Sequence, residues 1–344
     1  MHLIPSRSLA LALAVAAVGS AAQAAERPTY GPQMEGFEQP HEIHRHALDT
    51  QGQKLEMGYM DIAPMGEANG QTAVLLHGKN FCAATWEGTI AELTKAGYRV
   101  VAPDQVGFCT ASKPEGYQFS FAQLAHNTRD LLESLDVKEA VLVGHSMGGM
   151  LATRFALSYP DQVSRLVLVN PIGLEDWQAE GVPYASVDEA FETERKTNFD
   201  SIKKYQQDIY YNGDWKPAYD RWVQMQAGMY AGPGGEIVAM NQAQTSDMVF
   251  TQPVVHEFGR LQVPTVLMIG MLDRTAPGAN RAPDEVAQRL GNYPELTARA
   301  EQAIPGATVV TFDTLGHSPQ IEAPEIFHKA LLETLAAEPT PKPE

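Results

Sequence analysis

Continuous runs of apolar residues recur along most of the chain and alternate with stretches whose apolar residues are spaced three or four positions apart. The runs are typical of parallel strands buried on both faces, and the spaced stretches are typical of amphipathic helices. Strands are predicted at residues 72–76, 98–102, 140–143, 166–169, 265–269 and 308–312. Helices are predicted at residues 86–96, 121–135, 147–158 and 324–336. This alternation predicts an α/β fold with a doubly wound, mostly parallel sheet.

Two segments do not follow this alternation of strands and helices. Residues 43–48 and 54–62 alternate partly around a Thr50-Gln51-Gly52 turn, which predicts an antiparallel hairpin and brings the sheet to eight strands. About 90 residues then separate the strand that ends at Val169 from the strand that starts at Thr265, and this interval is helical in spacing and rich in Trp, Tyr and Met. We expect residues 173–256 to form a helical cap over a core of residues 25–172 and 257–338.

The first 24 residues have the pattern of a secretory signal peptide. Arg7 supplies a positive charge, residues 9–18 form an apolar run, and Ala22-Gln23-Ala24 is a small-x-small cleavage site. The run is shorter than the roughly 20 residues that span a bilayer, so we expect cleavage after Ala24 and no stable membrane insertion afterwards. The mature chain is then secreted or periplasmic. Residues 26–39 resemble an extended arm, and residues 339–344 a flexible tail.

The net charge of the chain bears on which classes of molecule it binds. The 344 residues carry a formal net charge of −17, which disfavours nucleic acid, whose phosphates the surface would repel. Composition is that of an ordinary globular protein, with 44% hydrophobic residues, so a sizeable core is expected. We expect a small-molecule substrate, neutral or cationic.

The strongest chemical signal is Gly144-His145-Ser146-Met147-Gly148, which joins a predicted buried strand to a predicted helix. A Gly-x-Ser-x-Gly turn in this context is a nucleophile elbow. The turn is so tight that its flanking positions must be glycine, and it exposes the Ser146 hydroxyl at the positive end of the following helix. His145 lies inside the elbow, and we expect it to pack or form a hydrogen bond there.

With this motif the chain resembles the α/β-hydrolase fold family from about Leu55 to Leu335. Further matching motifs are His77-Gly78, Asp104-Gln105-Val106-Gly107 and Gly316-His317. The resemblance implies an α/β-hydrolase core with an inserted cap. It also places the catalytic histidine in the loop after the last strand, which is the position of His317.

A serine nucleophile needs a base, and the base needs a carboxylate on its second nitrogen. Asp273 lies just past the penultimate strand, and the chain order Ser146, Asp273, His317 is the order of this fold. Two other aspartates are nearby candidates for the acid. Asp284 lies too far past the penultimate strand, and Asp313 lies on or beside the last strand. The family's alternative acid position, after the sixth strand, holds Asn170, which carries no charge.

The resemblance also implies an oxyanion hole of two backbone N–H groups. One belongs to Met147, after the nucleophile. The other belongs to the residue after His77-Gly78, which is Lys79, with Asn80 as a second choice. The turn at residues 104–107 is expected to support this loop rather than take part in catalysis.

The two cysteines, Cys82 and Cys109, lie in loops that follow neighbouring strands and emerge at the same edge of the sheet. In an oxidising compartment we expect them to form a disulfide that braces the loop carrying Lys79. His44 and His46 would share one face of a strand, but no matching ligand cluster accompanies them, so we expect neither a metal nor an organic cofactor.

These features predict an exported serine hydrolase that cleaves a small carboxylic ester or lactone through an acyl-enzyme. Hydrolysis of a C–C or amide bond, or cofactor-free peroxidation, would use the same triad. A ligand-binding receptor with residual hydrolase activity is the alternative of another class. Because function resides in the site and the cap rather than in the fold, the sequence leaves these readings open.

Overall fold

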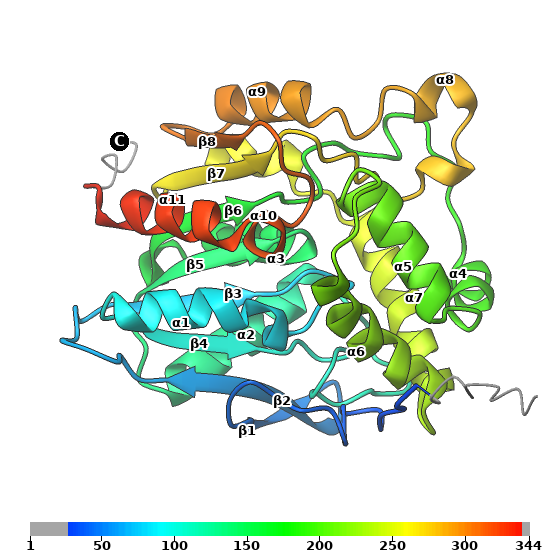
Figure 1. Ribbon diagram of the computed structural model, residues 1–344, viewed down its shortest axis with the longest axis horizontal. Helices are drawn as coiled ribbons and strands as arrows, with labels where there is room; N and C mark the ends of the chain where they lie inside the picture. Colours follow the sequence, from blue (N-terminus) through cyan, green and yellow to red (C-terminus); the bar gives the residue numbers. More distant parts are fainter. Residues whose placement is uncertain (1–26, 339–344) are drawn as a thin grey trace, which may run out of the picture.

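Eight strands form one sheet in the computed structural model, which describes residues 27–338 (Figure 1). The strand order is β1-β2-β4-β3-β5-β6-β7-β8. Only the β1–β2 and β2–β4 pairs are antiparallel. The strands are β1 (His44–Thr50), β2 (Gln53–Ile62), β3 (Thr72–Leu76), β4 (Arg99–Pro103), β5 (Ala140–His145), β6 (Val163–Val169), β7 (Thr265–Gly270) and β8 (Thr308–Phe312). The predicted mostly parallel, eight-stranded α/β fold is confirmed. The predicted signal peptide and tail lie outside the described residues.

Helices cover both faces of the sheet because neighbouring strand residues point to opposite sides. Val74 and Leu76 pack in the cluster that contains α2 (Phe121–Ser134), α3 (Met147–Ser158) and α9 (Tyr293–Ala303). Ala73 and Leu75 pack in the other cluster, with α1 (Glu87–Lys95) and α11 (Pro324–Ala336). Burial on both faces is why these strands read as continuous apolar runs.

Shorter helices fill the connections of the core. They are η1 (Ala83–Trp86), η2 (Pro160–Gln162), η5 (Val255–Arg260), η6 (Ala279–Arg281), α8 (Asp284–Ala287) and α10 (Pro319–Glu322). The helix predicted to begin at Trp86 begins instead at Glu87, because the preceding turn is 3₁₀. Helix α9 was not predicted, although its buried residues Tyr293, Leu296, Thr297 and Ala300 have helical spacing.

Between β6 and β7 the described chain is helical. It forms α4 (Val187–Glu194), α5 (Phe199–Tyr205), the π-helix η3 (Gln206–Tyr210), η4 (Pro217–Tyr219), α6 (Asp220–Ala231) and α7 (Gly235–Thr251). Capping boxes at Ser186 and Asn198 start α4 and α5. In Figure 1 these helices gather at one end of the sheet. We call residues 173–256 the cap.

The N-terminal arm lies against the cap. The backbone N–H of Tyr30 donates to the carbonyl of Gly228 in α6 over 2.8 Å. The side chains of Tyr30 and Met34 are buried in the same cluster as Met225 and Met229 of α6. The arm therefore helps to hold the cap on the core.

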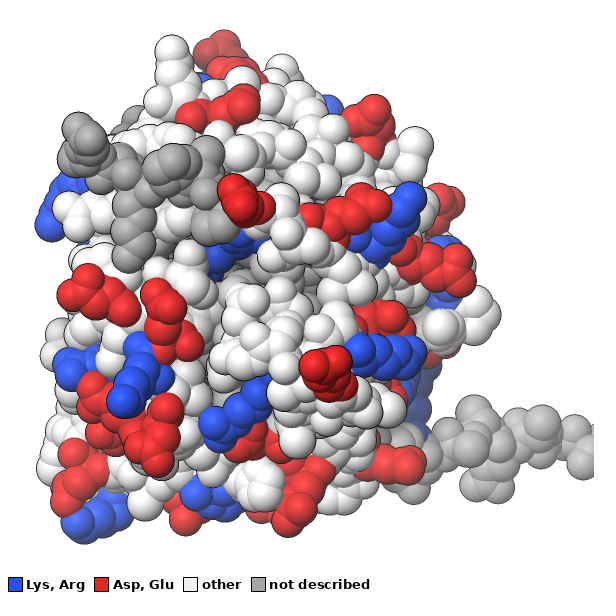
Figure 2. Space-filling view, turned by 90° about the vertical axis from the view of Figure 1, so that its left-hand side faces the viewer, with Lys and Arg blue, Asp and Glu red and all other residues white. Residues whose placement is uncertain are grey.

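The surface away from the cap carries intermixed charges. Figure 2 shows the side of the molecule that forms the left-hand edge of Figure 1, and acidic and basic side chains alternate on it without a continuous basic area. Within residues 27–338, no helix combines the length and hydrophobicity needed to cross a membrane.

Candidate active site

Ser146 occupies the turn between β5 and α3 with φ 57° and ψ −122°, a strained conformation for a residue with a side chain. A Cβ on Gly144 would lie 2.3 Å from the carbonyl oxygen of Gly148, and a Cβ on Gly148 would lie 2.1 Å from the carbonyl oxygen of Leu76. Both glycines are therefore required for the turn to close. The turn holds the Ser146 side chain at the wall of a cavity.

Asp273 and His317 meet at the ends of β7 and β8. His317 Nδ1 lies 2.6 Å from Asp273 Oδ2, and both side chains are fully buried. Asn170 Nδ2, at the end of β6, donates to the same oxygen over 2.9 Å, and the backbone N–H of Thr275 donates to Oδ1 over 2.8 Å. Asn170 thus stands at the alternative acid position and supports the acid at the other one.

These contacts keep Asp273 ionised. Burial by itself would raise the pKa of the carboxyl group, but His317 beside it and the hydrogen bonds from His317 and Thr275 hold the pKa of Asp273 below its usual value. A carboxylate only accepts hydrogen bonds, so His317 Nδ1 carries the proton. In the neutral form of a ring protonated at Nδ1, Nε2 is the acceptor. His317 Nε2 is buried with no hydrogen-bond partner among the described residues.

His145, which precedes Ser146 in the chain, contacts His317. The His145 and His317 ring centroids lie 4.9 Å apart, and His145 Nε2 donates to the carbonyl oxygen of His317 over 2.8 Å. Burial, and to a smaller extent the His317 ring, lowers the pKa of His145 to about 3, so His145 is neutral. In this structure no hydrogen bond joins Ser146 to His317 Nε2.

Two residues that sequence reasoning missed hold the backbone around His317. Glu322 in α10 accepts hydrogen bonds from the N–H groups of Gly316, at 2.9 and 3.1 Å, and Ser318, at 3.3 Å. Tyr210 in η3 accepts the N–H of His317 through its carbonyl over 2.9 Å, and its ring centroid lies 4.3 Å from the imidazole. Gly316 is needed there because a Cβ would lie 2.1 Å from the Tyr210 carbonyl oxygen. No sequence motif marks Tyr210.

The two predicted oxyanion donors flank Ser146. Met147 is the first residue of α3, so its N–H has no acceptor within the helix. The loop that carries Lys79 passes close to the elbow, because a Cβ on Gly78 would lie 2.9 Å from Ser146 Cβ. Lys79 and Asn80 both line the cavity beside Ser146.

Two devices brace this loop. Cys82 and Cys109 form a disulfide with a Cα–Cα distance of 5.8 Å, as the sequence suggests. Asp104 Oδ1 accepts the N–H of Ala83 over 2.7 Å, and Oδ2 accepts the N–H of Thr110 over 3.1 Å. The oxyanion loop is therefore tied to the loop after β4 by a covalent bond and a shared carboxylate.

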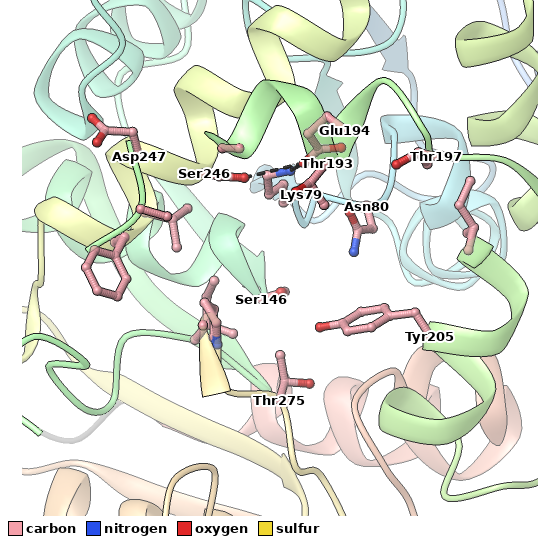
Figure 3. A pocket seen from close by; sticks show the side chains of 18 of the residues that line it. Lys79, Asn80, Ser146, Thr193, Glu194, Thr197, Tyr205, Ser246, Asp247 and Thr275 are labelled. Carbon is pink, nitrogen blue, oxygen red and sulfur yellow. Dashed lines mark hydrogen bonds and ion pairs between the residues drawn. The ribbon is translucent and has the colours of Figure 1, made fainter. Parts of the chain in front are cut away.

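The cavity above Ser146 has a volume of about 400 Å³ and lies between core and cap (Figure 3). Among the aromatic residues of the cap, Tyr205, Tyr210 and Phe250 line it. Tyr211, Trp215 and Tyr219 pack on one another instead. A cavity of this size accommodates a small organic substrate.

The candidate metal ligands serve other purposes. His46 Nε2 lies 3.0 Å from Asp130 Oδ2, and the His44 ring lies 5.4 Å from that of Tyr59. In residues 27–338 one group of ligand-type side chains converges, formed by Cys82, Asp104 and Cys109. Its sulfur atoms are bonded to each other in the disulfide. This group is therefore the loop brace described above.

A strained serine in an elbow at the edge of a mostly parallel sheet, with a buried histidine–carboxylate pair beside it, defines the class of α/β hydrolases. The family profile described as alpha/beta hydrolase fold matches residues 73–324. The chain therefore belongs to the α/β-hydrolase fold family.

Individual relatives agree with this assignment. A crystal structure of a probable hydrolytic enzyme from Pseudomonas aeruginosa PAO1 is 59% identical, has a TM-score of 0.89, and aligns over 90% of this chain and 99% of that one. The 2-hydroxy-6-oxo-2,4-heptadienoate hydrolase of Pseudomonas putida is 25% identical over 82% of this chain and 98% of its own length. An uncharacterized protein of Mycobacterium tuberculosis is 39% identical over 106 residues, which are 31% of this chain and 30% of that protein.

Proposed function

We propose that the chain is an exported serine hydrolase that cleaves a small carboxylic ester or lactone, with Ser146, His317 and Asp273 as its catalytic triad. The observation that carries the proposal is the hydrogen bond between His317 Nδ1 and an ionised, buried Asp273, which leaves Nε2 free as a base. The strained elbow presents Ser146 at the cavity wall beside this pair.

In the proposed cycle, His317 Nε2 takes the proton of the Ser146 hydroxyl while Oγ forms a bond to the substrate carbonyl carbon. The N–H groups of Met147 and Lys79 stabilise the oxyanion. His317 then gives its proton to the departing alcohol as the C–O bond breaks. Water repeats the sequence on the acyl-enzyme, and the products are the acid and the alcohol with Ser146 restored.

Two features support export. The first 24 residues have the pattern of a signal peptide, and Cys82 and Cys109 form a disulfide, which persists in oxidising compartments. N-terminal sequencing of the native protein tests this part. The proposal expects a mature chain that begins at Ala25.

Hydrolysis of 4-nitrophenyl butanoate tests the reaction. The wild type should release 4-nitrophenol, and Ser146→Ala should lower the rate by at least about 1,000-fold. Absence of release by the wild type would favour a ligand-binding receptor, and release that Ser146→Ala leaves unchanged would remove the serine from the mechanism.

The relative from Pseudomonas putida favours a second candidate, hydrolysis of a carbon–carbon bond. The compound in its name, 2-hydroxy-6-oxo-2,4-heptadienoate, has neither an ester nor a lactone group to hydrolyse. Assaying 2-hydroxy-6-oxo-2,4-heptadienoate beside the ester distinguishes the two. A kcat/KM higher for this compound than for the ester would make C–C hydrolysis the main activity.

A further inference from the structure

The cavity above Ser146 has parts of different character. One part, which we call the polar wall, comes from the oxyanion loop and from α4, α6 and α7, and consists of Lys79, Asn80, Thr193, Glu194, Gln226 and Ser246. Elsewhere Ile172, Val249, Phe250 and Pro277 provide apolar lining. Figure 3 shows Lys79, Thr193, Glu194 and Ser246 gathered on one side of Ser146, with Tyr205 and Thr275 on another.

An ion pair lies at the centre of the polar wall. Lys79 Nζ lies 2.9 Å from Glu194 Oε1, and each side chain is 17% exposed. Lys79 also donates to Gln242 Oε1 over 3.2 Å, and the Tyr230 hydroxyl donates to Glu194 Oε2. Apolar residues would join cap to core without the cost of removing two charges from water. The pair instead leaves polar atoms facing the space that the substrate enters.

Gln226 adds a buried acceptor that no group within residues 27–338 satisfies. Its Nε2 donates to Asn80 Oδ1 over 3.3 Å, but its Oε1 is buried without a hydrogen-bond partner among the described residues. The side chain is 8% exposed and lines the cavity. A buried amide oxygen without a partner costs free energy, which a substrate hydroxyl or N–H group would recover.

The charges in the cavity lining cancel. Lys79 and Arg281 are the cations, and Glu194 and Asp247 are the anions. Asp247 accepts a hydrogen bond from Tyr184, and the Arg281 guanidinium lies 5.3 Å from the Phe250 ring centroid. Because Lys79 is the cation of the polar wall and is already paired with Glu194, an anionic group that enters the polar wall would find no unpaired cation there.

Building on the proposed function, we propose that the polar wall selects uncharged esters or lactones that carry a hydroxyl, ketone or amide group a few bonds from the reacting carbonyl. This group binds the polar wall while the apolar lining holds the rest of the substrate. Lys79 then has two roles, because its backbone N–H serves the oxyanion and its side chain sets specificity.

Matched 4-methylumbelliferyl esters test this selection. The pairs are butanoate with 3-hydroxybutanoate and pentanoate with 4-oxopentanoate, and the hemisuccinate supplies an anionic analogue. The wild type should show a kcat/KM at least about tenfold higher for the better polar ester than for its apolar partner, as expected of a site built for hydrogen bonding. The hemisuccinate should be the poorest substrate.

The double variant Lys79→Met/Glu194→Met removes both charges together and keeps the backbone N–H of residue 79. The ratio of kcat/KM for the polar ester to kcat/KM for its apolar partner should fall to within about twofold, whatever the change in the absolute rates. Gln226→Met removes the free acceptor without touching the ion pair, and should also reduce the preference. This second variant keeps the test decisive if the first does not fold.

Arg154→Met/Glu257→Met is the matched control, because that ion pair is similarly half-buried, at 24% and 25% exposed, and does not line the cavity. It should keep the wild-type preference. Equal kcat/KM for polar and apolar esters in the wild type, or an unchanged preference in both polar-wall variants, overturns the inference while the hydrolase remains. Failure of the wild type to cleave any ester overturns the proposed function as well.

Discussion

Three residues of the candidate site show how side chains outside the proposed triad hold its members in place. Asn170 donates to Asp273, His145 donates to the backbone of His317, and Glu322 accepts from the residues on either side of His317. Each of the three supplies a hydrogen bond to a buried polar group that water cannot reach. The orientation of the imidazole is therefore determined by these partners as well as by Asp273.

Glu322→Gln tests this at one position. Glutamine keeps one acceptor oxygen but cannot accept both N–H groups with a charged carboxylate, so kcat should fall about tenfold with little change in KM. Steady-state kinetics on an aryl ester measures this. Glu325→Gln, an exposed glutamate on α11, is the control and should match the wild type. A wild-type kcat in Glu322→Gln would show that the loop carrying His317 keeps its conformation without the Glu322 carboxylate.

The sequence predicted residues of local motifs and missed residues that act across the fold. Gly144, Ser146 and Gly148 are identifiable because strand, turn and helix are contiguous. Glu322 and Tyr210 are not, because their contacts with the His317 loop depend on how a short helix and an inserted cap pack. The same limit applies to the Lys79–Glu194 pair, whose members lie 115 positions apart.

At the scale of elements, η3 links the cap both to the His317 loop and to the loop that carries Asn80. Tyr210 contacts His317 through its carbonyl and ring, and its hydroxyl accepts a hydrogen bond from Asn80 of the oxyanion loop over 2.8 Å. π-Helices are rare and occur frequently at functional sites. The cap therefore contacts the proposed catalytic residues as well as covering the cavity.

Substitutions at Tyr210 separate these contacts. Tyr210→Phe keeps the ring and the carbonyl and should lower kcat by less than about tenfold, whereas Tyr210→Ala frees the imidazole and should lower it about 100-fold. Tyr219→Ala removes another buried cap ring that contacts neither His317 nor the cavity, so it should lower the melting temperature with kcat nearly unchanged. Equal losses of kcat in Tyr210→Ala and Tyr219→Ala would show that Tyr210 contributes only through packing.

The disulfide constrains two loops that are 27 residues apart in sequence. A closed loop of this length stabilises the fold by about 3.5 kcal/mol through the entropy of the unfolded chain. Cys82→Ala/Cys109→Ala should lower the free energy of urea unfolding by about this amount and reduce kcat by loosening the oxyanion loop. A change below about 0.5 kcal/mol would mean that Asp104 alone braces the loops.

Among the elements, continuous strands and long amphipathic helices were predictable, and α3 and α11 have the predicted bounds. Helix α9 was missed although its buried residues have helical spacing, because they include the polar Thr297 and the small Ala300. The path of the cap was not predictable either. Burial of the cap depends on contacts with the core and the N-terminal arm, which a local pattern does not contain.

At the scale of the whole molecule, buried histidines determine how stability responds to acid. Burial lowers the pKa of His77, His145 and His328, so these side chains stay neutral in the fold. In the unfolded chain they take up protons near pH 6.5. Because the unfolded state then binds more protons, the free energy of unfolding should fall as the pH drops below about 6.5.

Two acids, the buried Glu175 and the half-buried Glu322, act in the opposite direction. Burial raises the pKa of Glu175 and Glu322, so each favours the folded state at low pH and loses that contribution as the pH rises through its raised pKa. Asp273 and Glu257, whose pKa values are lowered, act in the same direction as the histidines, and we expect the sum to be a net loss of stability on acidification. Urea unfolding at pH 7, 6 and 5 should show a falling midpoint, and His328→Gln should reduce the slope. A constant or rising midpoint would contradict this account.

The central claim is that the elbow and the buried pair make Ser146 a nucleophile. Fluorophosphonate labelling followed by peptide mass spectrometry tests it most directly, with Ser134→Ala as control. Ser134 Oγ also lies near a histidine–aspartate pair, 3.3 Å from His46 Nδ1, but on an ordinary helix without an elbow. Labelling confined to Ser146, absent in Ser146→Ala and unchanged in Ser134→Ala, is the predicted result. Labelling that persists in Ser146→Ala, or none in the wild type, would contradict it.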